Sequence, residues 1–150
     1  MKKRITALLL LLVVAALLCA CGSKQKNRTP EETAMMFVKA CANNDFDMFS
    51  QCVHPKMLEE WADEWLDSEP DGRFQLTEIH TGMVTDASEE EVENFQDNIG
   101  EDYGITKITA LKTVTVYAKG YDYFEAKEVS SVASCKVFLS DSCWYAWGWS

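Results

Sequence analysis

Few side chains in this 150-residue sequence have the types and spacing that catalysis or metal binding requires. The two histidines, His54 and His80, lie far apart in the chain and lack the spacing of helical metal ligands. The cysteines beyond residue 40 contain no Cys-x-x-Cys pair, the spacing typical of zinc sites and redox motifs. A Gly-x-Ser-x-Gly elbow and a glycine-rich phosphate loop are absent too. We therefore expect no metal site, no cofactor and no nucleophilic catalysis.

Cys41 and Cys52 could form a disulfide bond. Both are expected on the inward faces of consecutive helices that are joined by a tight break. A bridge would need an oxidising compartment, and closing a loop of this length would contribute roughly 2–4 kcal/mol to stability. Two buried free thiols are the alternative. Cys135 and Cys143 flank a hairpin turn at offset positions, so we expect that pair less.

Isomerase-type chemistry would need a carboxylate base and acidic donors held in an apolar pocket. His80, on an expected strand, and Asp45, at a helix break, are the residues that could point inward. A surface or capping role explains each of them more simply. We therefore assign no catalytic residue.

The last eight residues, "CWYAWGWS", are strongly aromatic. Strict alternation along a strand would place Tyr145, Trp147 and Trp149 on one face. Large aromatic side chains contribute heavily to the core of a small domain, which is the simpler explanation of this row. Part of the row could also line a pocket.

Trp61 and Trp65 lie one helical turn apart, so both should face the same way, toward the sheet. All five tryptophans lie beyond residue 20, and this aromatic bulk exceeds what a thin core readily hides. We expect an apolar pocket between this helix and the last strand, suited to a flat or apolar ligand. Its expected lining is Trp61, Trp65, Tyr145, Trp147 and Trp149.

The N-terminus has the pattern of a secretory signal. Residues 1–4 are "MKKR", and residues 5–18 are apolar apart from Thr6. That stretch is too short to span a hydrocarbon core of about 30 Å comfortably as a helix. A basic end, a short apolar segment and a small-residue exit are typical of a signal peptide rather than a membrane helix.

The signal ends in "LCAC", residues 18–21, which resembles the bacterial lipobox. The resemblance implies a diacylglyceryl group on Cys21, cleavage between Ala20 and Cys21, and loss of Cys19 with the signal. Two acyl chains give stable membrane anchoring, whereas one chain gives only reversible binding. We therefore expect membrane lipid to be a partner through Cys21.

The charge of the chain argues against nucleic acid as a partner. Three of the 14 basic side chains lie in residues 1–20, so the remainder carries 24 acidic against 11 basic side chains, a net charge of −13. Nucleic-acid affinity depends largely on lysine and arginine contacts to phosphates. Residues 22–28, "GSKQKNR", are basic and would lie against an anionic membrane surface.

Capping signals and apolar periodicity predict four helices. "TPEE" at 29–32 and "SEEE" at 88–91 have the pattern of capping boxes, and Pro30 suits the first helical position. "NND" at 43–45 and "HP" at 54–55 break the first two helices. Alternating β-branched residues indicate strands from Ile105 onward, so an antiparallel sheet follows the helices and the class is α+β. The expected helices are 30–42, 46–53, 56–67 and one from 89 toward Gly100 or Gly104. The expected strands are 73–86, 108–120, 129–139 and 143–150.

Residues 29–57, "TPEETAMMFVKACANNDFDMFSQCVHPKM", resemble the opening of the cystatin-like α+β fold of nuclear transport factor two, SnoaL and ketosteroid isomerase. The closing "CWYAWGW" is similar to the last strand of that family, although Ser142 and Cys143 stand where Gly-Lys is usual. The resemblance covers about residues 29–149. It implies a curved sheet wrapped on helices, which forms a cone whose mouth can hold a small ligand. Family members use the cone for catalysis, dimerisation or peptide binding, and the fold does not choose among these.

These patterns divide the chain into a signal peptide (1–20), a lipidated cysteine with a polar tether (21–28) and one cystatin-like domain (29–150). We expect an extracytoplasmic protein, lipid-anchored to the bacterial cell membrane, that binds a small apolar ligand or an envelope protein without catalysis. An isomerase- or dehydratase-like enzyme that uses a carboxyl or histidine in the cone is one alternative. A structural module that forms a homodimer through the sheet is another.

Overall fold

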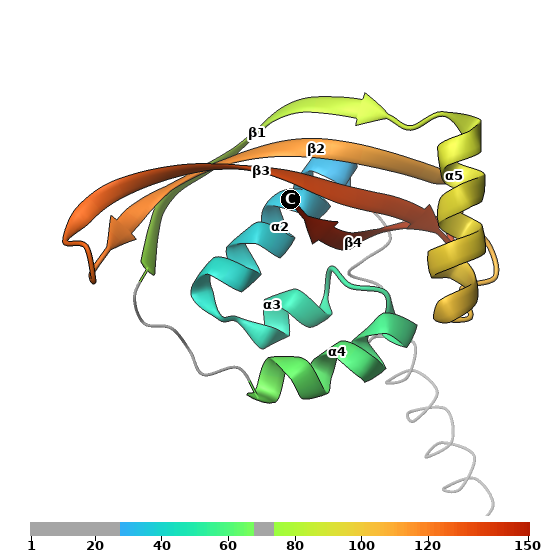
Figure 1. The fold of residues 1–150 in the computed structure, drawn as a ribbon, viewed down its shortest axis with the longest axis horizontal. Coiled ribbons are helices and arrows are strands. Elements are labelled where there is room, and N and C mark those ends of the chain that lie inside the picture. Colours follow the sequence, from blue (N-terminus) through green and yellow to red (C-terminus); the bar gives the residue numbers. More distant parts are fainter. Residues whose placement is uncertain (1–27, 68–73) are drawn as a thin grey trace, which may run out of the picture.

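Three helices lead into a four-stranded sheet in the computed structural model, which describes residues 28–67 and 74–150 (Figure 1). The expected signal peptide at 1–20, its lipidation residue Cys21 and residues 22–27 of the tether lie outside these residues. The α+β class is confirmed. The elements are α2 (Pro30–Asn43), α3 (Phe46–Ser50), α4 (Pro55–Asp67), β1 (Phe74–Asp86), α5 (Glu89–Phe95), the π-helix η1 (Gln96–Gly100), β2 (Ala110–Asp122), β3 (Lys127–Ser140) and β4 (Cys143–Trp149).

The strands pair antiparallel in the order β1-β2-β3-β4, so each strand lies beside its neighbour in the sequence. The sheet arches over α2 and α3, which lie on its concave side (Figure 1). β2 and β3 form a long hairpin in continuous register from the Ala110–Leu139 pair to the Asp122–Lys127 pair. β1 pairs with β2 through two register shifts, and these irregularities explain why residues 73–86 alternate imperfectly.

The capping box expected at the start of α2 is present. The Thr29 hydroxyl accepts a hydrogen bond from the Glu32 N–H at 3.2 Å, and the Glu32 carboxylate accepts one from the Thr29 N–H at 2.9 Å. The helix ends at Asn44, whose φ of 51° is a left-handed conformation that asparagine tolerates. Phe37 and Val38 are buried on the side of α2 that packs on the sheet.

The connection from α3 to α4 is buried around His54. The sequence predicted a helix from Lys56, and α4 begins one residue earlier because Pro55 occupies the first helical position. His54 Nδ1 accepts a hydrogen bond from the Lys56 N–H at 3.2 Å. The imidazole packs edge-on against Tyr145, with ring centroids 4.7 Å apart. His54 is therefore part of the core.

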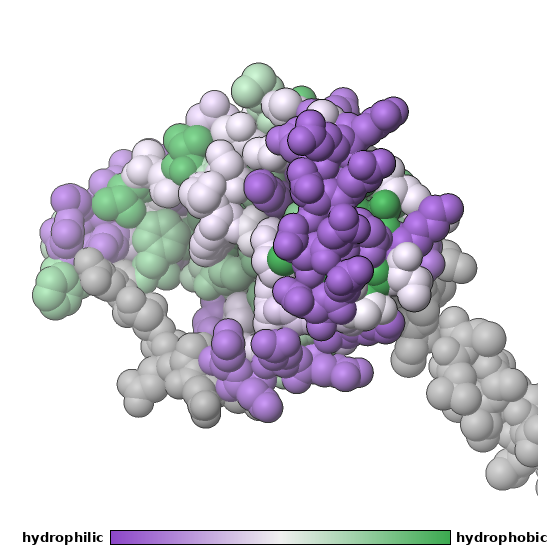
Figure 2. All heavy atoms as spheres, turned by 45° about the vertical axis from the view of Figure 1, so that its right-hand side comes forward, coloured by the Kyte–Doolittle hydropathy of each residue, from purple (hydrophilic) through white to green (hydrophobic). Residues whose placement is uncertain are grey.

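The second expected capping box, between Ser88 and Glu91, is also present at the start of α5. The sequence predicted one helix toward Gly100 or Gly104, and helical backbone does reach residue 102. The regular α-helix ends at Phe95, however, and the π-helix η1 follows it. Gln96 braces this transition, since its side chain donates to the Ile105 carbonyl at 2.9 Å and accepts from the Ile108 N–H at 2.6 Å. Hydrophilic side chains cover the outer surface of α5 and η1, with small apolar areas beside them (Figure 2).

The core lies between α2 and the concave face of the sheet. Val114 and Val116 of β2 and Cys135 and Val137 of β3 are fully buried there. The free edge of β4 is covered by the α3–α4 connection, because the Ala146 N–H donates a 2.7 Å hydrogen bond to the carbonyl of residue 52. Covering an edge in this way protects it from pairing with another chain.

Candidate functional site

The aromatic side chains of α4 pack against those of α3 and β4. The ring centroids of Trp61 and Trp147 lie 5.6 Å apart, and those of Trp65 and Phe49 lie 4.3 Å apart. The Trp61 indole N–H donates a hydrogen bond to the Tyr103 hydroxyl at 3.1 Å. Both tryptophans of α4 contact Phe49, so they face the same way, as their spacing predicts. These contacts lie where we expected an apolar pocket from the sequence.

The aromatic residues of β4 do not share one face of the sheet. Tyr145 pairs with Phe138, whereas Trp149 pairs with Cys135. Phe138 and Cys135 are three residues apart on β3, so their side chains point to opposite faces. The expectation of one face rested on strict alternation, and a register shift at Trp147 breaks that alternation.

A cavity of about 460 Å³ lies between α2 and the concave face of the sheet, and we call it the concave-face cavity. α2 contributes Val38 and Cys41, and β1 contributes Phe74. Trp149, at the end of β4, lines it as well and is 47% exposed. The Trp149 ring is held edge-on to Phe37, with centroids 5.8 Å apart.

Small side chains on the sheet create this space. Ala118 of β2 and Ser131 of β3 are direct cross-strand partners, and Ala133 is the next residue on the same face of β3. Farther along the same face, the larger Val114 and Val116 fill the gap to α2. The sequence signal for this cavity is the change from valine to alanine and serine along the inward face of β2 and β3, a signal that the prediction of the pocket from tryptophan spacing did not include.

The side chains that line the concave-face cavity are mostly apolar, and none of them is charged. Its one titratable side chain is Cys41, and burial raises the pKa of that thiol to about 12. Among the described residues that line it, none has a carboxylate or imidazole side chain. The cavity can therefore hold an apolar molecule, with Ser131 and Ser150 as its hydroxyl groups. A volume of about 460 Å³ lies within the range of roughly 300–1,000 Å³ that is usual for small-molecule sites.

The four cysteines of the described residues carry free thiols, so the bridge that we expected between Cys41 and Cys52 is not formed in this structure. Cys52 is fully buried, and its thiol donates to the Phe49 carbonyl at 3.2 Å. Burial also raises the pKa of Cys52 and of Cys135 to about 12. Because a thiolate is the reactive form of cysteine, these thiols are poor nucleophiles.

Asp45 and His80, the two residues considered as an acid or base, lie away from the concave-face cavity. The Asp45 carboxylate caps α3 by accepting a hydrogen bond from the Met48 N–H at 2.9 Å. His80 is exposed on β1 and stacks on Tyr117, with ring centroids 5.0 Å apart. These positions match the capping and surface roles that we considered simpler.

No group of three or more histidine, cysteine, aspartate or glutamate side chains is placed to hold a metal ion within residues 28–67 and 74–150. None of the helices in that part of the chain is both long and apolar enough to cross a bilayer.

Comparisons with protein-family models, with curated proteins and with solved structures give no match for this chain. The resemblance to the cystatin-like family therefore stays a prediction. The observed architecture, a curved antiparallel sheet with helices on its concave side, is compatible with that prediction (Figure 1).

Proposed function

We propose that this chain is a lipid-anchored protein of the bacterial cell envelope whose folded domain binds a small, uncharged, apolar ligand. The ligand would occupy the concave-face cavity, in contact with Phe74 and Trp149. The observation that supports this proposal best is the chemistry of the side chains that line the cavity, which are mostly apolar and include a single titratable one, the protonated Cys41 thiol.

Binding without catalysis fits this lining better than an isomerase or dehydratase does. Those reactions need a general acid or base within hydrogen-bond reach of the substrate. The imidazole of His54 is enclosed by Tyr145 and Phe138 in the core, and the Asp45 carboxylate is used as a helix cap. An apolar ligand would gain affinity mainly from the burial of its surface, at roughly 25 cal/mol per Å².

The envelope location rests on the first 28 residues of the sequence. The basic end, the short apolar stretch and the "LCAC" ending together predict export and a diacylglyceryl anchor on Cys21. The acidic domain would be repelled by an anionic membrane surface, while the basic tether would be attracted to it. Such an arrangement would hold the concave-face cavity in the aqueous space near the membrane.

A fluorescence titration of the full chain with N-phenyl-1-naphthylamine, an apolar environment-sensitive dye, tests the proposal. We expect saturable binding that Trp149→Ala weakens at least fivefold, which corresponds to about 1 kcal/mol. Ala133→Leu should also weaken binding, because the larger side chain would occupy part of the cavity.

Trp144→Ala is the matched control, since Trp144 lies on the same strand but contacts Lys112 rather than the cavity. It should leave the dissociation constant unchanged within about twofold. Equal losses in Trp149→Ala and Trp144→Ala, or no saturable binding by the unaltered chain, would contradict the proposal.

A further inference from the structure

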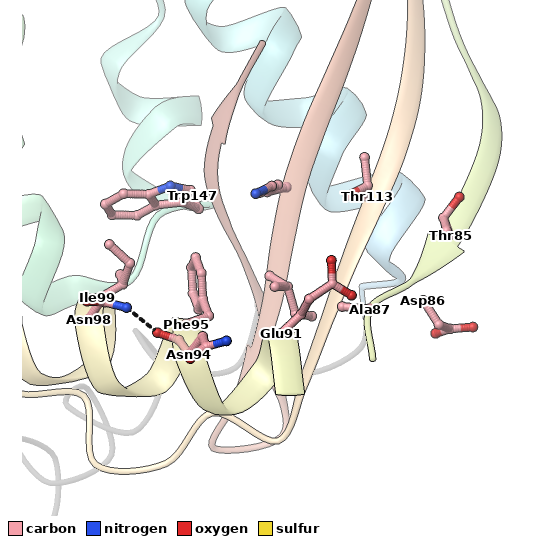
Figure 3. A pocket seen from close by; sticks show the side chains of 12 residues that line it. Thr85, Asp86, Ala87, Glu91, Asn94, Phe95, Asn98, Ile99, Thr113 and Trp147 are labelled. Carbon is pink, nitrogen blue, oxygen red and sulfur yellow. Dashed lines mark hydrogen bonds between the residues drawn. The ribbon is translucent and has the colours of Figure 1, made fainter. Parts of the chain in front are cut away.

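A second cavity, of about 440 Å³, lies beside α5 and η1, and we call it the α5 groove (Figure 3). Its floor is a row of polar side chains across the sheet, Thr85 of β1, Thr113 of β2 and Lys136 of β3, which are direct cross-strand partners. Thr113 and Lys136 adjoin Val114 and Cys135 in the sequence, so they project from the opposite face of the sheet. The α5 groove is therefore separate from the concave-face cavity.

A glycine continues this polar row on β4. Gly148 is the cross-strand partner of Lys136, so a side chain at position 148 would project toward the groove. A Cβ atom built at Gly148 meets nothing within 4 Å. The glycine thus leaves open space next to Lys136 in the sheet.

Polar side chains of α5 and η1 form the wall of the groove. Glu91, Asn94 and Asn98 are spaced by three and four residues, so they lie along one side of the helix. The Asn98 amide donates a 2.6 Å hydrogen bond to the Asn94 carbonyl, as the dashed line in Figure 3 marks. The Asn94 carboxamide makes no hydrogen bond to the described residues, so its donor and acceptor are available to a ligand.

The wall is held in place by the π-helix. π-Helical turns are rare and are often found at functional sites. The two hydrogen bonds of Gln96 fix η1 to the segment that leads into β2. A Cβ at Gly100 would overlap the Gln96 side-chain amide, so a larger residue there would displace this brace from its hydrogen bonds.

One end of the groove is apolar and aromatic. Phe95 and Ile99 rise from α5 and η1 toward Trp147, which lies above them in Figure 3. Phe95 and Trp147 are held edge-to-face, with centroids 5.8 Å apart. This end can contact an apolar ring face or a methyl group.

The charged groups of the α5 groove compensate one another. Two hydrogen bonds from Ser88 lower the pKa of the Glu91 carboxyl, and the positive charge of Lys136 lowers it further. Asp86 forms an ion pair with Lys112 at 2.6 Å. Each charged side chain of the groove therefore has an opposite charge nearby, and the groove offers both donors and acceptors of hydrogen bonds.

We propose that the α5 groove binds a neutral saccharide. A pyranose ring carries hydroxyl groups around its edge and has an apolar face, and the groove offers the complementary groups. Carboxamides and hydroxyls both donate and accept hydrogen bonds, as do sugar hydroxyls, while the carboxylate only accepts and the ammonium only donates. Asn94, Thr113 and Lys136 would bind the ring edge, and the Phe95–Trp147 end would bind its apolar face.

Isothermal titration calorimetry of the full chain with cellobiose, maltose and N,N′-diacetylchitobiose tests this site. We expect at least one of the three to bind with a dissociation constant of about 1 mM or lower. Asn94→Ala should weaken that binding at least fivefold, and Gly148→Leu should abolish it by filling the open space.

The controls separate this site from the concave-face cavity. Trp149→Ala should leave saccharide binding unchanged, and so should Asn43→Ala, an exposed asparagine at the end of α2. Circular dichroism of each variant verifies the fold, and Asn94 is exposed, so its truncation should leave the fold intact. The proposal is overturned if none of the saccharides binds up to about 20 mM. It is also overturned if Asn94→Ala binds as the unaltered chain does, or if the groove binds L-lysine in preference to all three.

Discussion

Burial keeps the cysteines around α2 and α3 protonated. Cys52 and Cys135 are fully buried, and the pKa of each thiol is raised to about 12. At neutral pH such groups are almost entirely in the thiol form, which is unreactive toward alkylating agents and disulfides.

Iodoacetamide labelling measures this protection. At pH 8 we expect Cys52 and Cys135 of the folded chain to react at least about tenfold more slowly than in guanidinium chloride, with rates that increase as the pH is raised. Mass spectrometry of the peptides gives the rate at each cysteine. Rapid labelling of Cys135 in the folded chain would contradict the account. A disulfide between Cys41 and Cys52 would instead block both in guanidinium until a reductant is added.

His54 should make stability depend on pH. Burial lowers its pKa below the usual histidine value of 6.5, so the unfolded chain binds a proton at a higher pH than the folded chain does. The free energy of unfolding should therefore be highest above pH 6.5 and should decrease as the pH falls from 6.5 toward the lower pKa of the folded state.

Urea unfolding between pH 7.5 and 5.5 tests this dependence, because most carboxyl groups titrate at lower pH. His54→Gln should remove most of the slope, whatever its effect on overall stability, while His80→Gln should retain it. The same slope in both variants would show that His54 is not its source.

At the scale of secondary structure, Gly100 and Gly148 allow a direct comparison, because a side chain added at Gly100 would meet Gln96 whereas one added at Gly148 would meet open space. Gly100→Ala should displace Gln96 and break its hydrogen bonds to residues 105 and 108, so we expect it to destabilise the chain by about 1–3 kcal/mol. Gly148→Ala meets open space and should change stability by less than about 0.5 kcal/mol. Urea unfolding of both variants gives the comparison. A stabilising Gly100→Ala, as expected for an ordinary helical glycine, would mean that the Gln96 brace is unimportant.

Local signals predicted the elements well. The Thr29 capping box, the helix break near Asn44 and the alternation of β2 and β3 each depend on residues close together in the sequence. The π-helix was not predicted, because it depends on the hydrogen bonds between Gln96 and residues 105 and 108, which form only in the folded chain.

The sites depend on contacts between elements, so the sequence predicted them less well. The two faces of β4 follow from its register with β3, where the shift at Trp147 cannot be recognised from one strand alone. The concave-face cavity arises because Ala118 and Ala133 lie across from α2. The polar row that includes Thr113 and Lys136 spans three strands, and its members are scattered in the sequence.

For the whole molecule, the two proposed sites lie on opposite faces of the sheet. The concave-face cavity faces α2, and the α5 groove lies on the other face, beside α5. A protein with this arrangement could hold an apolar ligand and a saccharide at the same time. Both ligands would be accessible to a domain held near a membrane by its N-terminus.

Anchoring through Cys21 makes a direct prediction for the whole chain. Cys21→Ala should abolish radiolabelled palmitate incorporation and lipobox processing, whereas Cys19→Ala should retain both, because position 19 would be discarded with the signal. Mass spectrometry of the N-terminal peptide and membrane fractionation give the readouts. An unmodified mature N-terminus at another residue would contradict the lipid anchor.

The most direct test of the central claim is an NMR titration of the five tryptophan indole N–H signals of the ¹⁵N-labelled chain with N-phenyl-1-naphthylamine. Single Trp→Phe variants assign the signals. The account predicts that the Trp149 signal shifts most and that the Trp144 signal stays in place, because Trp149 lines the concave-face cavity. Shifts confined to Trp61, Trp65 and Trp147, with Trp149 unchanged, would contradict it and would place the apolar ligand between α4 and β4.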